Sequence, residues 1–283
     1  MEITKAGPDE IRFPSHRRRE AEIVAAFLPT LREKARELLA WQDRRPVRVV
    51  LAERPPGIGQ ACRVNVKGLA MWLVQFLALL IFAWALYGAA IGAVLGGLGA
   101  LVVVGSYSRP YLATRKAWPF IGGMAVYSPH WAEPIVFVNI GSWPTSPELE
   151  QLILELGPED WLRSVVAHEY AHIAMRARYR TASVPAWLGE GVGYWFAEEI
   201  AGAQYWGPES RSCLEEPEPR RDPWWRIADG AKQRAARYRL AARYYWEVQH
   251  LARAGRIGEL LATPLKKTGS LRPSPEQVRA GWQ

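Results

Sequence analysis

Cysteine is scarce in this chain of 283 residues, which contains Cys62 and Cys213 and no C-x-x-C pair. A disulfide framework is therefore not indicated, and we expect two free thiols in a reducing compartment, with a single disulfide as the alternative. We also expect segment 1–19 not to be a secretory signal peptide, because its basic residues have no apolar core behind them. We expect this segment to be polar and poorly ordered.

Charge is absent from the run Leu69 to Val104. As one helix the run would measure roughly 54 Å, whereas the hydrocarbon core of a bilayer is about 30 Å thick. The length therefore predicts a transmembrane helical hairpin, and Gly88, Gly92 and Gly96, spaced four apart, would allow its helices to pack closely. The alternatives are a single long tilted helix and a buried helix pair in a soluble protein.

Basic residues flank both ends of this run: Arg54, Arg63 and Lys67 before it, and Arg109, Arg115 and Lys116 after it. The positive-inside rule places both flanks in the cytoplasm, which requires an even number of spans. The sequence thus predicts an integral membrane protein with a lipid bilayer as partner and its remaining domain on the cytoplasmic side.

Nucleic-acid-binding motifs are missing as well, although the formal net charge is +8. A basic chain favours anionic partners, and a DNA-linked regulator would rest on this charge alone, so we expect no nucleic acid. The segment 220–256 is rich in arginine and includes Lys232, Arg234, Arg237 and Arg239. These side chains indicate either contact with anionic lipid headgroups or an ordinary solvated face.

Hydrophobic periodicity predicts an α+β fold that is mainly helical with a small β-sheet. We expect a break or kink at Pro29 in the first helix, and either a lid or a surface loop over 207–225. The expected helices cover 20–41, 147–156, 159–179, 185–201, 229–254 and 257–261, and the expected strands cover 46–52, 120–128 and 133–141.

The segment "RSVVAHEYAHIAMRARY" contains His168 and His172 four residues apart, with Glu169 directly after the first. On a helix the two imidazoles share one face, where both can direct a nitrogen at one Zn²⁺ at about 2.0–2.1 Å. Glu169 is rotated away from this pair and can hold a metal-bound water and take its proton. The alternative is two core histidines that hydrogen-bond to their neighbours.

A catalytic zinc site needs a third protein ligand and one open position. The downstream segment "SVPAWLGEGVGYWFAEE" supplies Glu190, which we predict to be that ligand. Gly189 and Gly191 flank it and leave room for helices to approach closely. Glu198 and Glu199 are the competing carboxylates, and we expect them at the solvated end of their helix.

These two segments resemble the gluzincin metallopeptidases, in particular the peptidase MA-like domains. That family has an HExxH helix followed, somewhat under twenty residues later, by P-x-W-L-x-E-G-x-A-x-Y. The sequence departs from this pattern at Gly193, where the family usually has Ala, a change that we expect not to touch a ligand. The resemblance covers about Trp161 to Glu199 and matches at His168, Glu169, His172, Pro185, Trp187, Leu188, Glu190 and Gly191, with Tyr194 one position before the tyrosine of the pattern.

The resemblance implies a thermolysin-like catalytic domain that hydrolyses peptide bonds of peptide or protein substrates. It would make His168, His172 and Glu190 the zinc ligands and Glu169 the general base. The tetrahedral oxyanion needs a further donor, for which Tyr194 is the best candidate because it lies one turn after Glu190. Other candidates are Tyr244, Tyr245 and His250.

The sequence is therefore interpreted as a membrane-anchored zinc metallopeptidase of four parts. A catalytically silent, membrane-tethered scaffold of the same fold is the alternative, although a scaffold would need no general base. The predicted parts are an N-terminal helix and strand over 1–66, an inserted transmembrane segment over 67–107, the metallopeptidase domain over 108–270 and a polar tail over 271–283.

Overall fold

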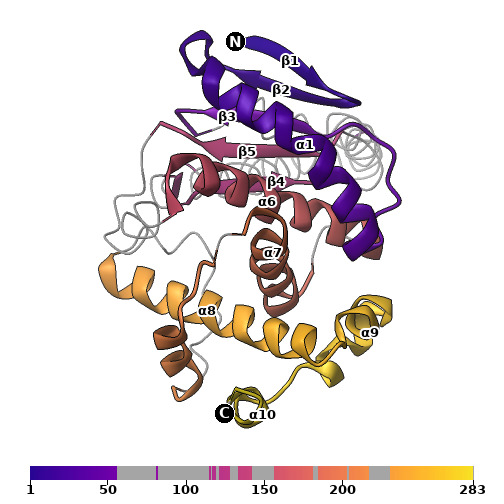
Figure 1. Ribbon diagram of the computed structural model, residues 1–283, viewed down its shortest axis with the longest axis vertical. Helices are drawn as coiled ribbons and strands as arrows, with labels where there is room; N and C mark the ends of the chain where they lie inside the picture. Colours follow the sequence, from indigo (N-terminus) through magenta and orange to yellow (C-terminus); the bar gives the residue numbers. More distant parts are fainter. Residues whose placement is uncertain are drawn as a thin grey trace.

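A computed structural model describes residues 1–55, 81, 115, 117–118, 121–127, 133–141, 156–180, 184–202, 204–216 and 230–282. The predicted α+β class is confirmed, with a five-stranded mixed sheet and several helices (Figure 1). The predicted helical hairpin lies, apart from Ile81, outside these residues, and so does the helix expected over 147–156. Among the helices that the structure does describe, none is long and apolar enough to cross a bilayer.

The sheet has the strand order β1-β2-β3-β5-β4. β2, β3 and β5 run parallel to one another, while β1 pairs antiparallel with β2 and β4 pairs antiparallel with β5. The strands expected over 46–52, 120–128 and 133–141 are confirmed as β3, β4 and β5. Their bounds are β1 (Glu2–Ala6), β2 (Asp9–Phe13), β3 (Arg48–Ala52), β4 (Gly123–Val126) and β5 (Ile135–Asn139).

The N-terminal segment forms β1 and β2, so the prediction that residues 1–19 are poorly ordered is wrong. Ile11 and Phe13 of β2 are buried while Glu10 and Arg12 between them are half-buried, which is the alternation of a strand with one face on a core. β2 joins the sheet by pairing with β3, a strand more than thirty residues later in the chain. That long-range pairing has no local signal.

Side chains of the central strands point alternately to two apolar layers. Val49 of β3 and Val136 of β5 join the main core, whereas Val50 and Phe137, one residue later in each strand, join a smaller cluster around Trp118 on the other face. All five residues of β5 are buried. A strand covered on both faces reads as a continuous apolar run, as "IVFVN" does.

Helix α1 (Arg18–Leu39) contributes to the main core across one face of the sheet (Figure 1). It continues through Pro29, so the helix does not break there, and the alternative of a kink stays a prediction. Pro29 lies on the exposed side, while the apolar stripe that includes Val24, Leu28 and Leu31 is fully buried. Packing of this stripe offsets the local cost of an interior proline, about 3 kcal/mol.

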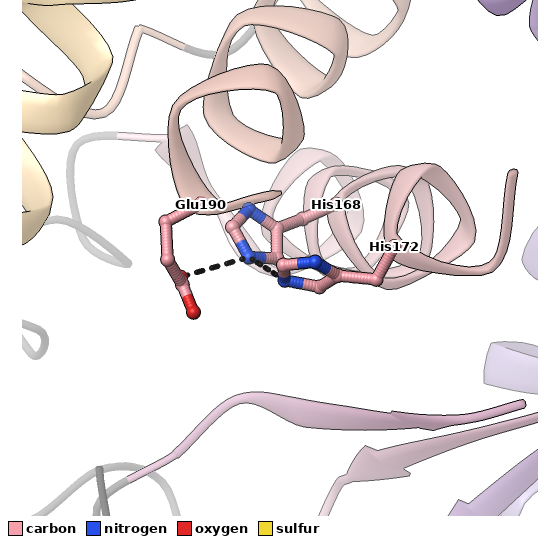
Figure 2. A group of neighbouring side chains, drawn as sticks. All are labelled: His168, His172 and Glu190. Atoms are coloured by element: carbon pink, nitrogen blue, oxygen red, sulfur yellow. Dashed lines mark hydrogen bonds and ion pairs between the residues drawn. The ribbon is translucent and has the colours of Figure 1, made fainter. Parts of the chain in front are cut away.

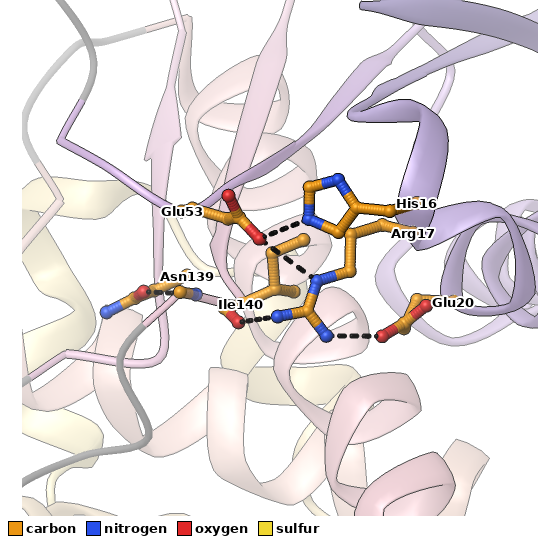
Figure 3. A network of polar contacts seen from close by, with 7 residues as sticks. His16, Arg17, Glu20, Glu53, Asn139 and Ile140 are labelled. Atoms are coloured by element: carbon orange, nitrogen blue, oxygen red, sulfur yellow. Dashed lines mark hydrogen bonds and ion pairs between the residues drawn. The ribbon is translucent and has the colours of Figure 1, made fainter.

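Polar contacts fix the N-terminal end of α1 against the ends of two strands (Figure 3). Arg17 donates to Glu53 at 3.1 Å, to Glu20 at 2.8 Å and to the carbonyl of Ile140 at 3.3 Å. His16 and Glu53 lie 2.7 Å apart. Each half-exposed pair contributes little alone, but together they join α1 to the residues that follow β3 and β5.

The remaining helices form a second part of the domain below the sheet in Figure 1. α6 lies next to β4, α7 packs against α6, and α8 packs against α7. The helices predicted over 159–179, 185–201, 229–254 and 257–261 are confirmed. Their bounds are α6 (Pro158–Tyr179), α7 (Ala186–Ala201), α8 (Ala231–Arg253), α9 (Ile257–Ala262) and α10 (Pro275–Ala280), with short 3₁₀ helices at Ser15–Arg17, Pro208–Leu214 and Leu265–Leu271.

Candidate metal centre

Helix α6 carries both histidines at the centre of the fold. It starts with Pro158, whose fixed φ suits the first helical position, and Glu159 and Asp160 favour the positive end of the helix dipole. Most of its central residues are buried, between the sheet on one side and α7 on the other. His168 is 8% exposed, so packing against neighbouring side chains fixes the orientation of its ring.

His168, His172 and Glu190 converge on one point between α6 and α7 (Figure 2). The Nε2 atoms of the two histidines lie 3.1 Å apart, and Nε2 of His168 lies 3.6 Å from Oε2 of Glu190. Tetrahedral ligands at about 2.0–2.1 Å from a zinc ion would be separated by about 3.3 Å. Two imidazole nitrogens and one carboxylate oxygen at these separations fit a zinc site, and the predicted ligand set comes together.

Glycines on α7, which have no side chain, allow α7 to approach α6 and α8 closely. A Cβ atom at Gly193 would lie 2.8 Å from Cε1 and 2.9 Å from Nδ1 of His168, closer than real Cβ contacts allow. Gly193 therefore does touch a ligand, contrary to the sequence prediction. A Cβ at Gly191 would collide with the carbonyl oxygen of Tyr244 on α8. The absence of a Cβ at Gly193 thus allows α7 to contact His168, and its absence at Gly191 allows α7 to contact α8.

Burial and mutual charge set the protonation of the triad. Burial opposes ionisation of Glu190, but the hydrogen bond with His168 and the charges of His172 and Arg237 hold its pKa well below the usual value. Burial lowers the pKa of His172 to about 3. Burial also disfavours the charged form of His168, yet Glu190 and Glu169 together raise its pKa. An ionised Glu190 beside a neutral His172 is the state that a cation requires.

Glu169 lies beside the triad on α6 and faces β4. Burial is the main cause that raises the pKa of its carboxyl to about 7. The strand is close, because a Cβ at Gly123 would lie 2.8 Å from Cγ of Glu169. The predicted general base is therefore buried between α6 and β4, one of the two edge strands of the described sheet.

Tyr194 lies against the triad, with its ring centroid 4.4 Å from that of His168. The other predicted oxyanion donors have partners elsewhere. The hydroxyl of Tyr245 donates to Glu198, and His250 lies against the C-terminal Gly281. The guanidinium of Arg272 lies over the ring of Tyr244, 5.4 Å from its centroid.

Neither competing carboxylate joins the triad. Glu198 is half-buried rather than solvated, because it accepts hydrogen bonds from Tyr245 and from Gln249, the latter at 2.6 Å. It joins α7 to α8. Glu199 is exposed, as predicted.

Two arginines near the triad were missed as site residues. Arg237 of α8 places Nη2 3.5 Å from Oε1 of Glu190. Arg176 of α6 donates to the carbonyl of Ala125 in β4 at 2.9 Å. Arg176 follows His172 by four residues, so the helical stripe could have identified it, whereas nothing local connects Arg237 with Glu190.

Comparisons with protein-family models, with curated proteins and with solved structures found no match to this chain. The geometry alone therefore supports a possible metal-binding triad, consistent with an HExxH…E zincin-like site.

Proposed function

We propose that this protein is a membrane-anchored zinc metallopeptidase. The observation that carries the proposal is the convergence of His168, His172 and Glu190 (Figure 2). Glu169 lies directly after His168 on α6. Three protein ligands leave one position on a zinc ion open, as in catalytic zinc sites, and Glu169 adds a second buried carboxyl next to the metal position, where it can act as a base.

The residues of the chain would divide the chemistry as follows. His168, His172 and Glu190 would hold Zn²⁺, which would lower the pKa of a water toward 7 and polarise a scissile carbonyl. Glu169 would accept a proton at its carboxylate and deliver it to the leaving amine. Tyr194 is the nearest of the predicted oxyanion donors and also holds the ring of His168 in place.

A peptide is the substrate class that the surroundings favour. β4 is the outermost strand on its side of the sheet in the part described, and it lies directly beside Glu169. The register with β5 turns the backbone groups of Gly123 and Ala125 outward, since the neighbouring Gly122 carbonyl accepts from Asn139 at 2.8 Å. The carbonyl of Ala125 already accepts from Arg176 at 2.9 Å, so the backbone groups of Gly123 are those with which a peptide would pair. An outward-facing strand edge beside a general base can pair with an extended peptide backbone.

The membrane anchor is proposed from the sequence alone. The uncharged run Leu69 to Val104 and its basic flanks support two spans with the catalytic domain in the cytoplasm. Lys232 is exposed on α8 and would be available to anionic lipid headgroups, whereas Arg239 pairs with Glu216 at 3.1 Å. Labelling of Cys62 in intact cells, in a Cys213→Ser background, tests the topology: labelling from outside would contradict it.

Cleavage of a peptide library tests the enzyme proposal. The full chain is purified in detergent and compared with Glu169→Gln and with the control Glu199→Gln, which changes an exposed carboxylate on α7. We expect the wild type and the control to cleave, and Glu169→Gln to lose at least about 10²-fold in rate while still binding zinc. Zinc binding without cleavage by the wild type would favour the scaffold alternative. Equal cleavage by Glu169→Gln would exclude the assigned mechanism.

A further inference from the structure

Arg237 directs its guanidinium at a metal ligand rather than at solvent. Its side chain is 21% exposed, and Nη2 lies 3.5 Å from Oε1 of Glu190. The other carboxylate oxygen, Oε2, lies 3.6 Å from Nε2 of His168. The two oxygens of Glu190 therefore have different neighbours: one faces the histidine pair and the other faces a fixed cation.

The packing of α8 on α7 holds Arg237 in this place. Arg237 and Tyr244 are seven residues apart, which is two helical turns, so they lie on the same face of α8. Tyr244 meets α7 at Gly191, the residue next to Glu190. The contact that brings the two helix backbones together therefore also brings the guanidinium to the carboxylate.

We infer that Arg237 is a positioning residue that makes Glu190 offer a single oxygen to the metal. The inference rests on the metal site of the proposed function but not on peptide cleavage. A carboxylate can bind a metal through one oxygen or through both. Because the guanidinium forms an ion pair with Oε1, it would draw that oxygen away from the metal. A three-ligand site with an open position is what catalytic zinc requires.

Hydrogen bonds that orient the ligands are few in the described part of the chain. Nδ1 of His168 is buried and has no hydrogen-bond partner among the described residues. Outer contacts of this kind normally orient a metal ligand, and their loss typically costs 10- to 100-fold in metal affinity. Because Nδ1 of His168 has no such hydrogen bond among the described residues, the ion pair of Arg237 with Glu190 is the main polar contact that orients a ligand there.

Zinc affinity and the visible spectrum of the Co²⁺-substituted protein test this role. The variant Arg237→Gln is compared with Arg239→Gln, whose side chain points away and pairs with Glu216 at 3.1 Å. We expect Arg237→Gln to bind zinc about 10- to 100-fold more weakly and to show the weaker cobalt absorption of a higher coordination number. The control should match the wild type in both measurements.

Two further variants separate positioning from general damage to the fold. Arg237→Lys keeps the charge without the planar fork and should recover part of the affinity. In a Glu190→Gln background, Arg237→Gln should cause no additional loss, because the pair is already broken. An equal loss in that background, or wild-type zinc affinity and spectrum in Arg237→Gln, would overturn the inference.

These readouts do not depend on peptide cleavage. If the wild type binds zinc with this dependence on Arg237 yet cleaves nothing, the proposed function fails and the positioning role stands. If the wild type binds no metal, both fail.

Discussion

Replacing Gly193 by alanine is the sharpest test of the geometry around His168. The new Cβ would lie 2.8 Å from Cε1 and 2.9 Å from Nδ1 of the imidazole, about 0.6 Å closer than ordinary van der Waals contact. The ring cannot move away freely, because it is buried and also contacts Tyr194. The substitution should therefore displace a metal ligand while leaving every donor atom in the chain.

The expected size follows from two opposing effects. Overpacking a buried site costs about 1–3 kcal/mol, whereas Gly→Ala within a helix gains about 1 kcal/mol. The fold should therefore change in stability by at most about 2 kcal/mol. The displacement acts on metal binding directly, and about 1.4–2.7 kcal/mol there corresponds to a 10- to 100-fold weaker zinc affinity. Competition with a chromophoric zinc chelator measures the affinity, and thermal melting of the metal-free protein measures the fold.

Gly189→Ala is the matched control on the same helix. Its Cβ would lie 3.5 Å from Nδ1 of His172, which is ordinary contact. We expect a stability gain of about 0.5–1 kcal/mol and unchanged zinc affinity. If Gly193→Ala binds zinc as tightly as this control does, the close packing of α7 on His168 is refuted.

Three further predictions concern the frame around the site. Gly191→Ala should lower the melting temperature by about 6–12 °C, because its Cβ would collide with the backbone of α8, at a cost of about 3 kcal/mol. Burial raises the pKa of the Cys213 thiol to about 12. In the variant Cys62→Ser, this thiol should therefore resist labelling by maleimide at pH 8 until denaturant is added, and rapid labelling of the folded protein would contradict the burial. Arg32→Met should cost about 3–5 kcal/mol in chemical denaturation, because it leaves Asp9 buried without its partner; an unchanged midpoint would contradict the pairing.

Local spacing made the centre of the site predictable. His168 and His172 are one helical turn apart, and Glu190 follows on the next helix, so their convergence depends on one helix–helix contact. Glu169 lies on the same helix as the two histidines and is itself buried. The strand signals of β3 and β5 were equally local, because both are short apolar runs between turn residues.

What the sequence did not reveal depends on contacts between distant segments. Arg237 reaches Glu190 only because α8 packs on α7, and its arginine-rich surroundings read equally well as a solvated face. β2 needs β3 as a partner, and Pro29 is tolerated because the other side of α1 is buried. Gly193 looked like a minor departure from a pattern, since its importance lies in the distance to a ring on another helix.

Zinc content tests the central claim most directly. Full-length protein purified in detergent, dialysed against trace zinc and analysed for metal should contain about one zinc per chain. His168→Ala should contain essentially none, while Arg239→Gln, altered on the exposed side of α8, should match the wild type. A wild type without zinc, or a His168→Ala variant that retains it, would contradict the assignment of this triad as a metal centre.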